Sequence, residues 1–114
     1  MVIVLFEITM KEGMAADYLQ KAAELKNELE KADGFLGAER FKSIANPNKL
    51  LSKSMWKDEE SIKAWRNNMA HRMAQKHGRQ NDFEAFTLTV VTPTRCYTMT
   101  DRDEAPADSN EFFK

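Results

Sequence analysis

The chain has a single cysteine, Cys96, among its 114 residues. An intrachain disulfide is therefore excluded, and one free thiol suits a reducing compartment. Long apolar runs are also lacking. The opening stretch 2–6 is apolar, but Glu7 and Lys11 end it before it reaches the length of a signal-peptide core or a membrane span. We therefore expect a cytoplasmic protein without a membrane partner.

Charge of one sign is not in excess either. The chain has 17 basic and 18 acidic residues and a formal net charge of -1 at pH 7, so no overall field attracts nucleic acid or an anionic membrane. A glycine-rich phosphate loop, a CxxC pair, an HExxH motif and a nucleophile elbow are all absent. Two histidines and one cysteine do not readily make a protein-only zinc site. We expect no metal and no other cofactor.

What the chain does have suffices for one hydrophobic core. Hydrophobic residues make up 42% and charged residues 31% of it, with a mean hydropathy of -0.61, which describes one domain with a water-facing surface. We place this domain at residues 1–98. Residues 99–114 are acidic, contain Pro106 and lack periodicity, so we expect a flexible tail.

Hydrophobic periodicity predicts four strands and two helices. The strands are expected at 2–9, 35–44, 50–56 and 86–97, and the helices at 15–32 and from Asp58 onward. Gly34 is expected to end the first helix in a left-handed turn. Acidic residues 58–60 begin the second helix, where the helix dipole favours them. Asn67 and Asn68 leave two forms open for this helix, one continuous helix or two short helices at an angle.

The resulting order β-α-β-β-α-β is the split βαβ pattern of the ferredoxin-like fold. It predicts an α+β domain in which a four-stranded antiparallel sheet carries both helices on one face. The first strand is apolar on both sides, so the other face of the sheet is apolar too. Val90 or Val91 would extend this patch. A homodimer that packs sheet to sheet would bury it.

Three segments resemble the antibiotic biosynthesis monooxygenase family. Residues 50–60, LLSKSMWKDEE, are similar to its third strand, which closes with Trp and an acidic helix cap. Residues 62–72, IKAWRNNMAHR, are similar to its W-x5-H segment, and residues 34–40, GFLGAER, to the start of its second strand. The resemblance covers residues 2–96 and implies a dimeric α/β barrel, in which each protomer holds a pocket between its helices and its sheet. Several chemistries occur in the family.

The resemblance implies roles for Trp65 and His71. Trp65 matches a pocket-lining Trp of the family, although it also lies on an apolar stripe where a core role is the alternative. His71 falls where some members carry a proton-handling residue, with an exposed helix histidine as the alternative. In a single straight helix the two side chains point apart, so they face one pocket only if the helix bends near Asn67 and Asn68.

Haem is the alternative cofactor, because some members of the family degrade haem. Those members use a pocket Trp, an Asn on the first strand and a ligating His in the second helix region. Here Trp65 is kept, but the ligand position falls on Gln75 and the first strand has no Asn. His77 lies two residues further on, a shift that rotates a helical side chain by roughly 200°. His77 is otherwise a helix-end histidine favoured by the dipole.

Between Glu60 and Asp82 the charges are all basic. This run is either a solvated helix face or a feature that draws an anionic ligand to a pocket mouth. It lacks the interleaved aromatics of a nucleic-acid site. The basic residues are Lys63, Arg66, Arg72, Lys76 and Arg79.

We predict an oxidoreductase, a cofactor-independent monooxygenase-like protein that acts on a small aromatic or quinol-type molecule. His71 and Trp65 are the catalytic candidates. The alternative is a protein that binds haem or an aromatic ligand without turnover. The residues expected to contact the substrate are Trp65, Met69, Arg72 and Gln75.

Overall fold

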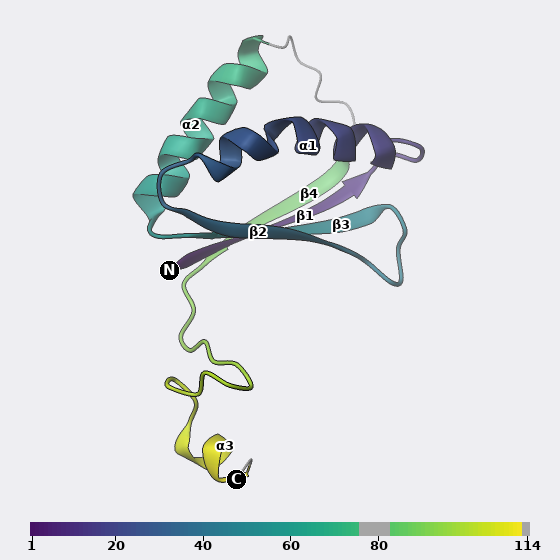
Figure 1. Ribbon diagram of the computed structural model, residues 1–114. Helices are drawn as coiled ribbons and strands as arrows, with labels where there is room; N and C mark the ends of the chain where they lie inside the picture. Colours follow the sequence, from purple (N-terminus) through teal and green to yellow (C-terminus); the bar gives the residue numbers. More distant parts are fainter. Residues whose placement is uncertain (76–82, 113–114) are drawn as a thin grey trace.

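One antiparallel sheet with helices on one face organises the molecule (Figure 1). The computed structural model describes residues 1–75 and 83–112, and for residues 70–75 and Phe112 the backbone alone. The sheet order is β2-β3-β1-β4, and α1 and α2 lie on the same side of it. The predicted ferredoxin-like α+β fold is confirmed. The elements are β1 (Val2–Met10), α1 (Ala15–Glu30), β2 (Phe35–Lys42), β3 (Lys49–Trp56), α2 (Glu59–Gln75), β4 (Phe83–Val91) and α3 (Ala107–Phe112).

The ends of some elements differ from the prediction. β4 begins at Phe83 and ends at Val91, not at residues 86 and 97. Pro93 has no N–H group to donate, so the strand ladder does not continue past it. α2 runs through Asn67 and Asn68 as one helix. Of the two forms left open, the continuous helix is therefore the observed one.

Alternation along β1 separates the two faces of the sheet. Its even-numbered residues face the helices, because Ile8 and Met10 form a buried core cluster with Leu50 that packs against Tyr18 of α1. Ile3 and Leu5 therefore lie on the opposite face. In the strand register, Ile3 is opposite both Met55 and Val91. The valines of β1 and Val90 face the helices, so the valine that extends the outward apolar patch is Val91.

The start of α2 is fixed by two local contacts. Asp58 Oδ1 accepts hydrogen bonds from the Ser61 backbone N–H at 2.9 Å and from the Ser61 hydroxyl at 2.8 Å, which is an N-cap. Gly34 has φ 80° and lies against Ser61. Its carbonyl accepts a 2.7 Å hydrogen bond from the Lys57 N–H. The turn after α1 is thereby joined to the first turn of α2.

The C-terminal segment leaves β4 on the side of the sheet that the helices do not cover (Figure 1). Arg102 organises it. Its guanidinium donates to Asn110 Oδ1 at 3.1 Å and to Ser109 Oγ at 3.0 Å, and it lies 4.8 Å from the centre of the Tyr97 ring. α3 lies in the stretch for which we predicted no periodic structure. Flexibility of residues 99–114 stays a prediction. In the described part of the chain, no helix has the length and apolar character needed to cross a membrane.

Replacing Gly34 with alanine tests the junction between α1 and α2. Gly13→Ala is the matched control, because its φ of 83° is nearly the same but nothing lies within 4 Å of the added Cβ. At Gly34 the Cβ would collide with the Ser61 hydroxyl and lie 2.6 Å from its Cβ. We expect Gly13→Ala to lower the free energy of unfolding by about 1 kcal/mol and Gly34→Ala by about 3 kcal/mol. Urea denaturation measures both, and equal losses would contradict the contact.

Acid titration tests the Asp58 cap. The hydrogen bond from the Ser61 backbone N–H, followed by that from its hydroxyl, lowers the pKa of Asp58 below its usual 3.8. A lowered folded-state pKa adds stability above the unfolded-state value, and this is lost as the pH falls through the folded-state pKa. Asp58→Ala should therefore be less stable than the wild type at neutral pH, with the difference shrinking below 3.8. Urea midpoints across this range give the result, and a constant difference would count against the cap.

Candidate functional site

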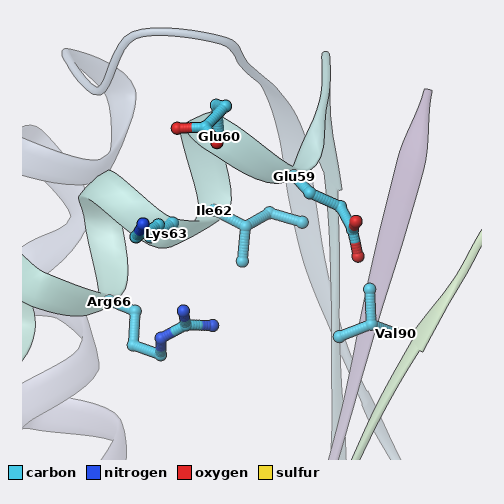
Figure 2. Close-up of a pocket in the computed structure, with 6 residues that line it drawn as sticks. All are labelled: Glu59, Glu60, Ile62, Lys63, Arg66 and Val90. Atoms are coloured by element: carbon cyan, nitrogen blue, oxygen red, sulfur yellow. The ribbon is translucent and has the colours of Figure 1, made fainter.

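An open cleft lies between the first turns of α2 and the edge strand β4. Its volume is about 270 Å³, and Figure 2 shows the side chains around it. Glu59, Ile62 and Arg66 follow the spacing i, i+3, i+7, which places them on one face of the helix. Figure 2 shows Glu59 and Arg66 extending toward the strands, with Val90 facing them. The lining residues are Glu59, Glu60, Ile62, Lys63, Arg66 and Val90.

A row of exposed apolar side chains on β4 adjoins this cleft. Phe86, Leu88 and Val90 are 63%, 53% and 41% exposed. They pair with Ile8, Phe6 and Val4 of β1, so they lie on the sheet face that carries the helices. Figure 1 shows α2 rising away from the sheet after its first turns, which leaves this row uncovered. An apolar surface beside a cleft suits an apolar ligand.

Edge-to-face aromatic contacts anchor the far end of the row. The Phe6 ring centre lies 5.6 Å from that of Phe86 and 6.1 Å from that of Phe83. Tyr18 of α1 meets Phe83 at 5.5 Å. Such contacts hold rings in fixed orientations. Phe86 therefore has one side packed and the other open to solvent.

Trp65 ties α2 to β3. Its ring centre lies 6.2 Å from that of Trp56, which is 2% exposed and lies 5.3 Å from the ring of Phe35. The Trp56 indole N–H donates to Ser54 Oγ at 2.9 Å. Trp65 itself is half-buried. Trp65 thus packs as a core residue, which was one of the two roles considered from the sequence. Its contact with a ligand stays a prediction.

The other predicted site residues follow on the same helix. Met69 is half-buried. His71, Arg72 and Gln75 belong to the last turns of α2, where the backbone alone is described. Trp65 and His71 stand about 120° apart around a continuous helix. The bend that a shared pocket would require is therefore not observed at Asn67 and Asn68. His77 lies outside the described residues.

Sequence reasoning missed Glu59 as a cleft residue and treated Arg66 only as part of a basic run. Glu59 was already explained as an acidic residue favoured by the helix dipole, and Arg66 as a charge on a solvated helix face. Their shared spacing with Ile62 was the available signal, because it places one acid and one base beside an apolar side chain. Among residues 1–75 and 83–112, no three His, Cys, Asp or Glu side chains lie close enough together to hold a metal ion.

Comparisons with known proteins identify the family and the fold of the chain. The jasmonate monooxygenase of Pyricularia oryzae is 39% identical over 87 residues, which are 76% of this chain and 40% of that protein. The chain thus spans two fifths of the length of this relative.

Solved structures share the fold at low identity. The haem degrader MhuD of Mycobacterium tuberculosis, solved with two haems in its active site, has a TM-score of 0.69 at 17% identity, covering 86% of this chain and 100% of MhuD. A protein of Deinococcus radiodurans assigned to the antibiotic biosynthesis monooxygenases has a TM-score of 0.72 at 14% identity, covering 87% and 98% of the two chains.

The family model that matches is antibiotic biosynthesis monooxygenase, over residues 1–77. This range holds β1 to α2, and with them the helix that supplies most of the cleft. The chain belongs to the antibiotic biosynthesis monooxygenase family.

Proposed function

We propose that this protein is a cofactor-independent monooxygenase that oxidises a small aromatic or quinol-type molecule in the cleft between α2 and β4. One observation carries the proposal, the exposed row of Phe86, Leu88 and Val90 beside the cleft. A planar apolar molecule on this row would cover surface that α2 leaves open. The name of the jasmonate monooxygenase relative supports an oxygenase reaction on a small organic molecule.

The proposed reaction takes its electrons from the substrate. A phenol with a free para carbon loses its hydroxyl proton, and the electron-rich ring then reacts with O2 at that carbon. The carbon loses its proton as the O–O bond breaks, so one oxygen atom enters the quinone and the other leaves as water. The protein's part is to remove the phenolic proton, hold the ring and keep bulk water away.

Two side chains are proposed for the proton step. The family resemblance supports His71, because histidine is the side chain best suited to proton transfer near neutral pH. Glu59 is carried by geometry, because its carboxylate extends toward Val90 in the cleft (Figure 2). Trp65 and Met69 are proposed to contact the ring, with Arg72 and Gln75 further along α2. Cys96, which is free and exposed, supports action in the reducing cytoplasm.

Incubation of the protein with a panel of phenols and quinols under O2 should give quinone faster than buffer. His71→Ala or Glu59→Gln should lower the rate about 100-fold, depending on which residue is the base, because a positioned base contributes on this order. Trp65→Ala should weaken substrate binding. Glu30→Gln on the exposed side of α1 is the control for lost acidic charge. Quinone absorbance and O2 consumption measure the rate.

Two results would contradict the monooxygenase proposal. One is a wild-type rate equal to the buffer rate across the panel. The other is a Soret shift on titration with haem that disappears in His71→Ala or His77→Ala, which would favour the alternative of a haem-binding protein. The similarity to MhuD, at 17% identity, supports a common fold. It is not evidence that this chain binds haem.

We further propose that the chain is a homodimer through the sheet face opposite the helices. Ile3, Leu5 and Val91 lie on this face with Leu51 and Met55, as the strand register shows. The salt bridge between Lys49 and Glu7, at 3.5 Å, lies at one end of it. These apolar side chains lie on a face that α1 and α2 do not cover (Figure 1). An interface of standard size, about 800 Å² per partner, would bury it.

Leu5→Lys should split the dimer, because it places a charge in the centre of the proposed interface. Leu19→Lys is the matched control, since Leu19 lies on α1 and is 45% exposed. Sedimentation equilibrium at micromolar concentration should give twice the chain mass of 13.1 kDa for the wild type and the control. A folded wild-type species at the monomer mass would rule out the dimer.

A further inference from the structure

We infer that Arg66 binds an anionic group of the substrate, and that this group is a carboxylate. The substrates would then be small apolar acids. This inference rests on the proposed function for the location of the binding cleft. It adds the substrate class and a residue that selects it. Arg66 lines the cleft one turn after Ile62, and Figure 2 shows its guanidinium extending toward β4.

The Arg66 guanidinium is available to bind a ligand. Arg66 forms no ion pair with another residue that the structure describes. Glu59, the acid on the same helix face, is two turns away, about 10 Å along the helix axis. In the sequence, no acid lies between Glu60 and Asp82. Among the described residues Arg66 thus projects into the cleft without an ion-pair partner, and such a group is suited to a ligand of opposite charge.

The surroundings favour a carboxylate that is attached to an apolar body. Arginine presents its N–H groups as a fork that fits both oxygens of a carboxylate. Val90 lies across the cleft from it, and Leu88 and Phe86 continue the same strand face. A ligand that lies on this row removes water beside the guanidinium, and the attraction between the two charges is stronger with less water present. The apolar row and Arg66 thus bind two different parts of one molecule.

Glu59 sets a second condition on the substrate. Its carboxylate lines the same cleft at the end away from Arg66. A second anionic group on the ligand would meet this carboxylate and be repelled. The arrangement therefore selects molecules with one acidic group at the Arg66 end and an uncharged group at the Glu59 end.

Calorimetric titration with 2-naphthoate and with its methyl ester tests the inference without any turnover. Both probes have the same apolar body, and only the acid has a charge. We expect Arg66→Gln to weaken 2-naphthoate binding about tenfold or more, because a hydrogen bond to a charged group is of this size. Ester binding should stay unchanged. Arg66→Lys keeps the charge without the fork and should fall between the wild type and Arg66→Gln.

Lys26→Gln is the control, because it removes the same charge from the exposed surface of α1. It should leave the affinities for both probes at the wild-type level. Equal weakening by Lys26→Gln would show a general charge effect and overturn the inference. So would equal affinity of the wild type and Arg66→Gln for 2-naphthoate, which would leave the proposed monooxygenase intact if the ester still binds. Failure of the wild type to bind either probe would overturn the role of Arg66, while the quinone assay judges the proposed reaction separately.

Discussion

The contact between Trp56 and Trp65 determines where α2 stands on the sheet, and the cleft depends on it. Trp56 is held from three sides, by Phe35, by Ser54 and by Trp65 itself. A rigid indole at the end of β3 thus fixes α2 near its second turn, while the cap at Asp58 fixes its start. Both anchors lie toward β3, and among the described side chains of α2 no aromatic contact or hydrogen bond of this kind attaches the helix to β4. The open cleft is the result.

The sheet and both of its faces were predictable from the sequence, because alternation of side chains and the order of elements are local signals. Gly34 was predicted as a left-handed turn for the same reason. Two features were not decided by the sequence pattern: α3 was not predicted, and the continuous form of α2 was one of two forms left open. α3 is accompanied by the side-chain contacts of Arg102. The continuity of α2 through Asn67 and Asn68 shows that helix hydrogen bonding outweighs the weak helix propensity of asparagine.

The candidate site was predictable in part. Trp65 stood out because of its resemblance to a family motif, and its place on the helix face toward the sheet followed from periodicity. Alternation also places Phe86, Leu88 and Val90 on one face. It does not say that the face is left uncovered, since that depends on the direction in which α2 leaves the sheet. Glu59 and Arg66 each had a sufficient local explanation, so their shared helix spacing was passed over, and the cleft that they line became evident only in three dimensions.

The place of β1 in the sheet has a consequence for the way the chain folds. β1 is the first strand in the sequence, yet its two neighbours are β3 and β4. Its partner residues lie about fifty and eighty positions further along the chain. On a ribosome, the first strand to emerge therefore waits for the last one before it is paired on both edges. Pairing between residues so far apart closes large loops, which slows folding relative to helical domains of the same size. The edge of this apolar strand that pairs with β4 stays unprotected until synthesis has passed β4.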